Sequence, residues 1–150
     1  MPNRTLRRRC PDRPRRIAFR VLRAVQVDGA YANLELARAL AGAHLEARDA
    51  AFVTELVAGT SRLAGTYDAI VAAASGRDQL DPALAEVLRL GAHQLLSMRV
   101  PLHAAVGATV DLAAAEVGEK VAGLTNAVLR KVAARDLDAW VAALAQGRDD

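Results

Sequence analysis

The chain has 150 residues and a net charge of +3, which is the size of one ordinary domain with a single hydrophobic core. Hydrophobic residues make up 53% of the chain and aromatic residues only 3%, so small aliphatic residues must form that core, and Ala and Leu favour helices. The only cysteine, Cys10, excludes an internal disulfide and a cysteine-based zinc site. With no uncharged apolar run of membrane-spanning length, we expect a cytoplasmic protein without a membrane partner.

Positive charge is concentrated at the start of the chain. The first 23 residues contain nine arginines and one acidic residue, Asp12, so the remainder is acidic overall. This asymmetry indicates a polyanionic partner. Residues 1–11 have no apolar periodicity and are predicted to form a disordered Arg-rich arm, followed by a domain over 12–147 and the start of a linker at 148–150.

Apolar residues recur at helical spacing from Asp12 onward, which predicts about seven helices. The first covers 13–28, because Asp12 can cap it and Asp28-Gly29 can end it. The second covers about 32–42, with Leu34, Ala37 and Leu40 facing inward. The third opens at Asp49 and persists to Ser75-Gly76, with Gly59 and Gly65 as positions where it bends or splits.

The second half of the chain continues the helical pattern. Asp81-Pro82 is a strong start signal for a helix that stops before Val100-Pro101, and further helices are predicted at about 103–117 and 120–134. A last short helix holds Trp140, Val141 and Leu144. No segment alternates apolar and polar residues between turn signals, so the fold class is all-α, a compact helical bundle.

Residue patterns typical of catalysis or metal binding are missing. The ten glycines form neither GxGxxG nor a phosphate-binding loop, and the three histidines lie on different elements without paired ligand spacing. Cys10 sits among solvated arginines, and Asp136/Asp138 and Asp149/Asp150 are interpreted as a helix cap and a solvated tail. We therefore predict no catalytic residue, no metal and no cofactor in this chain.

The first helix has one cationic face. At about 100° per residue, Arg13, Arg16, Arg20 and Arg23 fall within roughly an 80° arc, opposite the apolar residues. Arg7, Arg8 and Arg9 extend this face along the arm. Such a face can be merely solvated, but a solvated face normally mixes signs and this one offers only Asp12, which favours contact with nucleic acid. Phe19 at its border either stacks on a base or packs in the core.

Several segments together resemble one family. They are RRIAFRVL, GAYANLEL, RDAAFVTELVAGTSRLAGTYD, LRLGAHQLLSMRVPLHAAVGATVDLA and AGLTNAVLRKV, which span nearly all of residues 12–135. Read in order, they are similar to the NusB-like domain at the amino end of the RsmB (Fmu/Sun) ribosomal RNA methyltransferases. Free NusB antitermination proteins share the fold and an arginine-rich first helix that contacts RNA, and on that likeness Arg15 joins Arg13, Arg16, Arg20 and Arg23 as a predicted RNA contact.

This resemblance implies an activity that we expect to reside in a separate domain. Family members transfer a methyl group from S-adenosylmethionine to cytosine C5 of small-subunit ribosomal RNA with cysteines of a separate Rossmann-like domain. The expected role here is to bind ribosomal RNA beside that C-terminal methyltransferase domain. A module that docks on a ribosomal or transcription protein, and an autonomous antitermination factor, are the alternatives.

The remaining family motif residues have structural interpretations as well as interdomain ones. Pro101 is expected to set the turn between two helices, with His103 near the start of the next. Asn126 and Arg130 share a helix face at i,i+4, where they either tie helix to loop or reach a partner domain.

Overall fold

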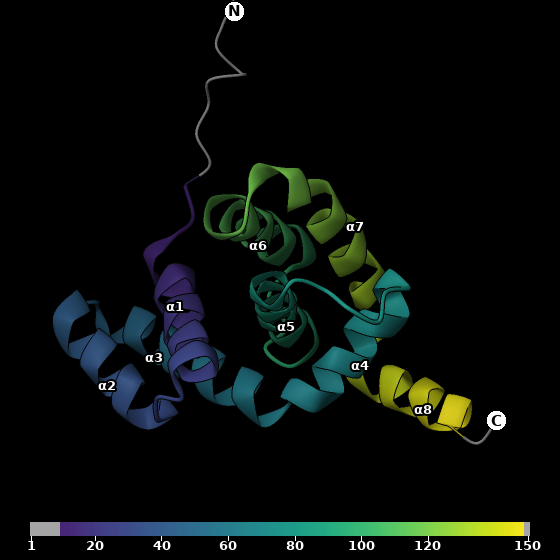
Figure 1. Ribbon diagram of the computed structural model, residues 1–150, viewed down its shortest axis with the longest axis horizontal. Helices are drawn as coiled ribbons and strands as arrows, with labels where there is room; N and C mark the ends of the chain where they lie inside the picture. The colour runs from purple at the N-terminus through teal and green to yellow at the C-terminus, as the bar shows by residue number, and fades with distance from the viewer. Residues whose placement is uncertain (1–9, 149–150) are drawn as a thin grey trace, which may run out of the picture.

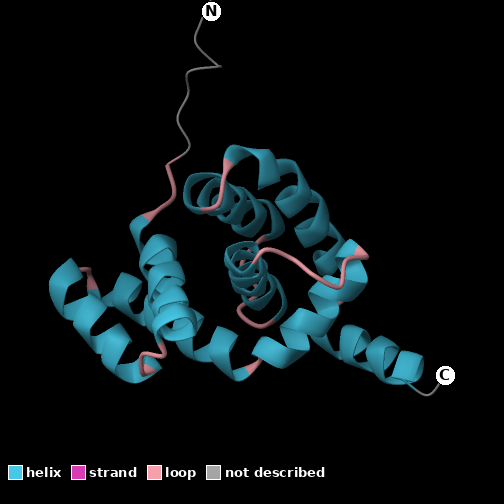
Figure 2. Ribbon diagram, in the orientation of Figure 1, coloured by secondary structure: helices cyan, strands magenta, loops and turns pink. Residues whose placement is uncertain are grey.

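The computed structural model describes residues 10–148, which fold into α-helices and one short 3₁₀ helix; Figure 2 shows no strand in this part of the chain. The elements in chain order are α1 (Arg13–Asp28), α2 (Ala32–Ala43), α3 (Ala47–Arg62), α4 (Ala64–Ser75), α5 (Pro82–Leu96), α6 (Leu102–Glu116), η2 (Glu119–Val121), α7 (Ala122–Ala133) and α8 (Leu137–Arg148). The predicted all-α fold is confirmed.

Helix α5 lies at the centre of the bundle, with α1 and α3 on one side and α4, α6 and α7 on the others (Figure 1). Two clusters of buried side chains meet along it. One joins α5 to α4, α6, α7 and α8, and the other joins α5 to α1, α3 and α6. Because α1 packs on α3, α5 and α6, its apolar face is anchored and its opposite face is left at the surface.

The ends of several helices follow the local signals in the sequence. The Asp12 carboxylate accepts from the Arg15 N–H at the start of α1, and Gly29 ends that helix in the left-handed conformation at φ 69°. Asp81 caps α5 ahead of Pro82, and Asp136 accepts from the N–H of Ala139 in α8. Each of these caps was predicted.

The long helix predicted from Asp49 to Ser75 is divided at Leu63, whose backbone (φ −105°, ψ 16°) ends α3 and precedes α4. The predicted positions for the break, Gly59 and Gly65, lie on either side of it. Gly59 instead allows close packing, because a Cβ there would overlap the buried His93 ring of α5. The eighth helix results from this division.

Of the three residues predicted to face inward on α2, Leu40 is confirmed, and Leu34 and Ala37 were wrong. Leu34 is 57% exposed and Ala37 is exposed, whereas Leu36, Ala39 and Leu40 pack against the core. Helix α2 packs mainly on α1 and α3 and contains no fully buried residue. Its packed side is therefore narrow, and it is rotated from the side that the apolar pattern of the sequence suggested.

No helix in residues 10–148 has the length and apolar character needed to cross a membrane.

Candidate nucleic-acid interface

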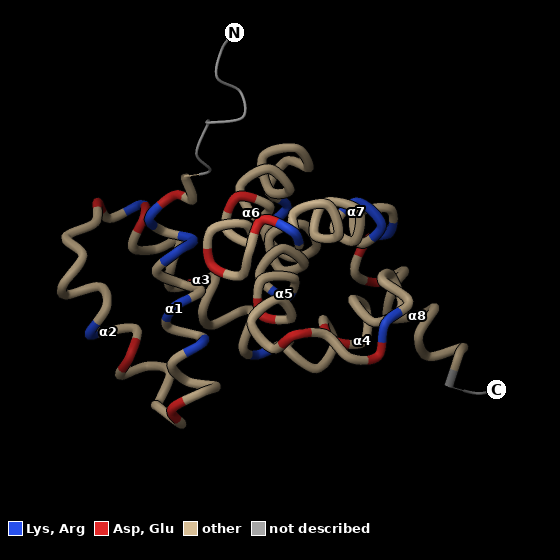
Figure 3. Tube along the Cα trace, turned by 45° about the horizontal axis from the view of Figure 1, so that its top comes forward, with Lys and Arg blue, Asp and Glu red and all other residues tan. Residues whose placement is uncertain are grey.

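Helix α1 carries a row of arginines on the face turned away from the core. Figure 3 shows basic positions repeating along this helix. Arg13 and Arg20 are exposed, and Arg16 and Arg23 are partly exposed, so the four arginines predicted from helical spacing do lie at the surface. Arg13 also donates from Nη2 to the carbonyl of Ala43 at the end of α2, at 2.9 Å. We call Arg13, Arg16, Arg20 and Arg23 the arginine face.

A carboxylate from a distant part of the chain contacts this face. Glu116, the last residue of α6, accepts hydrogen bonds from Nε and Nη2 of Arg20 at 3.1 and 3.2 Å. The Nε of Arg16 lies 3.9 Å from the same carboxylate. The expectation that Asp12 is the only acid near the arginine face was therefore wrong. One carboxylate between two guanidinium groups still leaves the pair positively charged.

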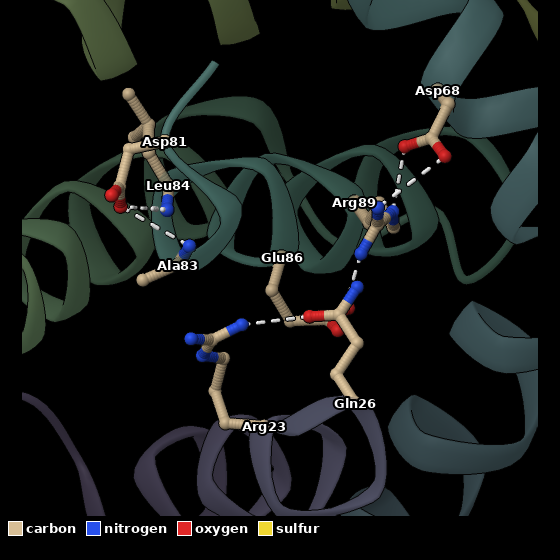
Figure 4. Close-up of polar contacts among 8 residues, drawn as sticks. All are labelled: Arg23, Gln26, Asp68, Asp81, Ala83, Leu84, Glu86 and Arg89. Atoms are coloured by element: carbon tan, nitrogen blue, oxygen red, sulfur yellow. Dashed lines mark hydrogen bonds and ion pairs between the residues drawn. The ribbon is translucent and has the colours of Figure 1, made fainter. Parts of the chain in front are cut away.

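The C-terminal end of the arginine face lies next to a second set of charged residues. Arg23 donates to Gln26 at 2.7 Å, and Glu86 and Arg89 of α5 lie beside them (Figure 4). Arg89 bonds the two oxygens of Asp68 at 2.6 and 3.3 Å and lies 3.2 Å from Glu86.

Glu86 is almost fully buried in this group. Burial raises the pKa of its carboxyl group, an effect that Arg89 and the charge of Arg23 oppose. Arg23 is therefore close enough to the buried Glu86 carboxyl group to favour its charged form, although Arg89 does so more strongly.

Arg15 occupies a different position from the other arginines of α1. Its side chain is 15% exposed, its Nε donates to the buried Gln94 at 2.7 Å, and its Nη1 lies 3.0 Å from Asp12. Its guanidinium also lies 4.9 Å from the centroid of the Phe52 ring. These contacts place Arg15 within the packing of α1 on α3 and α5. The spacing itself carries this signal, because Arg15 is about 200° from Arg13 around the helix, on the apolar side.

Two further predictions concern Phe19 and the arginines of the arm. Phe19 is buried, so the core interpretation is confirmed and base stacking by this ring is excluded. Arg7, Arg8 and Arg9 lie outside the described residues.

Three of the four family motif residues of the second half, all but Pro101, line a shallow groove between α6 and α7. Pro101 is the N-cap of α6, and His103 follows in its first turn. His103, Asn126 and Arg130 line the groove, whose volume is about 420 Å³. The Nε of Arg130 donates to Oδ1 of Asn126 at 3.1 Å, a bond that joins two turns of α7 and does not tie this helix to a loop.

A chain of polar contacts, which the sequence did not reveal, links α3, α4 and α5, with Tyr67 and His93 buried and Glu55 and Ser97 exposed. Tyr67 contacts Nδ1 of His93 at 2.7 Å and the Ser97 hydroxyl at 2.6 Å, and Nε2 of His93 contacts Glu55 at 2.9 Å. A neutral His93 with its proton on Nε2 satisfies every group if Ser97 donates to Tyr67 and Tyr67 donates to Nδ1. Burial lowers the pKa of His93, which supports this neutral form. We interpret the chain as structural.

Comparison with known proteins identifies relatives along most of the chain. A family model described as the NusB family matches residues 12–134. A putative methyltransferase of Mycobacterium tuberculosis is 50% identical over 141 residues, which are 93% of this chain and 31% of the relative. The ribosomal RNA small subunit methyltransferase B of Thermus thermophilus is 39% identical over 82% of this chain and 30% of the relative. The chain thus spans about a third of the length of these proteins.

A solved structure shares the fold. It is described as the crystal structure of a plectonemic RNA supercoil and superimposes with a TM-score of 0.70 at 23% identity, covering 81% of this chain and 94% of the matched chain. At this identity the likeness shows the fold alone. No group of three His, Cys, Asp or Glu side chains within residues 10–148 is placed to hold a metal ion.

Proposed function

Because the chain belongs to the NusB family and its relatives include ribosomal RNA small subunit methyltransferases, we propose that it is the RNA-binding part of such an enzyme. The arginine face of α1 is the observation that carries this proposal. The planar guanidinium group of arginine can donate two parallel hydrogen bonds to the oxygens of a phosphate. Four arginines repeat along one surface face of α1, and the packing of that helix on the core holds this face in place.

Binding would be dominated by the RNA backbone. Phe19, the aromatic residue at the border of the arginine face, is buried, so contacts between guanidinium groups and phosphates are the main interaction that we expect there. The methyl transfer itself, from S-adenosylmethionine to cytosine C5 of ribosomal RNA, would belong to a C-terminal methyltransferase domain outside this chain. A Rossmann-type cofactor site needs a glycine-rich turn after a strand, and residues 10–148 contain no strand, which supports placing a site of that type outside this part of the chain.

A protein partner is the second candidate. Val27, Tyr31 and Leu34 are large apolar residues that are well exposed near the turn between α1 and α2. Such residues are typical of docking surfaces when they form a contiguous patch, and a ribosomal or transcription protein is the partner class that this family suggests. RNA remains the better supported partner, because the arginine face lies on a helix that packs on α3, α5 and α6, whereas α2 contains no fully buried residue.

The proposal predicts a strongly salt-dependent association with single-stranded RNA from the small ribosomal subunit. If four phosphates are neutralised, a plot of log affinity against log salt concentration should have a slope of roughly −3. Titration at several salt concentrations, with backbone amide shifts followed by NMR, measures the slope and maps the surface. Shifts concentrated on α1 support the proposal. Shifts confined to the groove between α6 and α7, or a slope near zero, would contradict it.

A further inference from the structure

Glu116 stands where a helix disfavours a negative charge. It is the last residue of α6, at the end where the helix dipole is negative, and a cation is the usual charge there. Its side chain is only 13% exposed and points to α1 rather than to solvent. A carboxylate in this place is stabilised by its contacts with Arg16 and Arg20, so the contact across the two helices accounts for its position.

The contact with Glu116 uses the N–H donors on one edge of the Arg20 guanidinium and leaves the other edge without a bond to Glu116. Nε and Nη2 face Glu116, whereas the side chain as a whole is 63% exposed. A guanidinium has five N–H donors in a fixed plane, so donors on the outer edge remain for an external anion. The Glu116 carboxylate thus occupies one edge of the Arg20 guanidinium, and the N–H donors on the other edge are available to an external anion.

Arg16 is held less completely. Its Nε is buried and has no hydrogen-bond partner among the described residues, and at 3.9 Å from Glu116 it is attracted by charge without a hydrogen bond. The buried Nε is shielded from any external anion, but the Arg16 side chain as a whole is 39% exposed. A phosphate would therefore meet the exposed part of the Arg16 side chain beside Arg20.

We propose that Glu116 is a positioning residue, which holds Arg20 by hydrogen bonds and Arg16 by charge so that both receive one backbone phosphate of RNA. This inference rests on the proposed RNA binding. A free arginine loses much rotamer freedom when it binds a ligand, and the Glu116 contact removes that freedom before RNA arrives. The charge of Glu116 by itself would repel RNA. Ordering of the arginines strengthens RNA binding, whereas the negative charge of Glu116 weakens it. Removing the carboxylate therefore shows which of the two effects is larger.

Replacing Glu116 with alanine should weaken binding of a single-stranded oligouridylate of about twelve nucleotides by about two- to tenfold, although a negative charge is lost. Fluorescence anisotropy at one fixed low salt concentration measures the affinity. Glu116→Asp keeps the charge but draws the oxygens away from Arg20, and it should weaken binding in the same direction. Unchanged or tighter binding by both variants overturns the inference.

Two controls complete the test. Asp138→Ala removes one negative charge on α8, away from α1, and should not weaken binding. In an Arg16→Ala, Arg20→Ala background, Glu116→Ala should cause no further loss, because both side chains that it positions are gone. If the unmodified chain itself binds no RNA, the proposed function is contradicted; if it binds and the Glu116 variants match it, only the positioning role is overturned.

Discussion

Replacing Gly59 with alanine should lower the free energy of unfolding by about 1 to 3 kcal/mol. The added Cβ would overlap the ring of His93, which is 1% exposed and is held by Tyr67 and Glu55. The ring cannot withdraw without breaking these hydrogen bonds or separating α3 from α5. Urea unfolding followed by circular dichroism measures the change.

Gly107 provides the matched control. It lies inside α6, and a Cβ at this position meets nothing within 4 Å. Gly107→Ala should therefore raise the stability by about 0.5 to 1 kcal/mol through the better helix propensity of alanine. If the two variants had equal stability, the close contact between Gly59 and His93 would be absent in solution.

Replacing Arg15 with alanine should destabilise the domain by about 2 to 3 kcal/mol. The change removes the hydrogen bond to the buried Gln94, whose Oε1 then loses the partner at 2.7 Å, and it removes the guanidinium from the Phe52 ring. Arg20→Ala, which removes a largely exposed side chain, should change stability by no more than about 0.5 kcal/mol. Thermal unfolding of the two variants provides the comparison.

The same pair of variants separates structural arginines from RNA-binding ones. Arg20→Ala should weaken RNA binding while leaving the fold intact, and Arg15→Ala should do the reverse at temperatures where it remains folded. An Arg15 variant with unchanged stability and weakened RNA binding would show that the family-based assignment of Arg15 was right and that its internal contacts matter little.

Local signals predicted the parts of the structure that depend on neighbours in sequence. The start and end of α1 depend on Asp12 and Gly29, and the start of α5 depends on Asp81, each of which acts within a few residues. The inward side of α2 could not be obtained in this way. Leu34 and Leu36 are both leucines, and only the position of α1 and α3 decides that Leu36 is the one that packs.

The candidate RNA-binding site also combines features set by sequence neighbours with features set by the packing of distant helices. Helical spacing alone brings four arginines to one face of α1, and it places Arg15 toward the apolar side of the same helix. Arg15 was nevertheless predicted to contact RNA, because that prediction came from the family resemblance and not from the spacing. Glu116 could not be found, because it is 96 residues from Arg20 in sequence and meets it only through the packing of α6 on α1. The positive charge of the arginine face was thus predicted from the sequence, but its partial neutralisation by Glu116 was not.

The salt dependence of RNA binding by an Arg16→Ala, Arg20→Ala double variant tests the central claim most directly. Removing two phosphate contacts should flatten the log–log slope from roughly −3 to about half of that value and weaken binding at low salt. A Lys131→Ala, Arg135→Ala variant removes the same charge at exposed positions from the end of α7 to the start of α8 and should keep the slope. A double arginine variant whose affinity and slope equal those of the unmodified chain would contradict the assignment of α1 as the RNA-binding face.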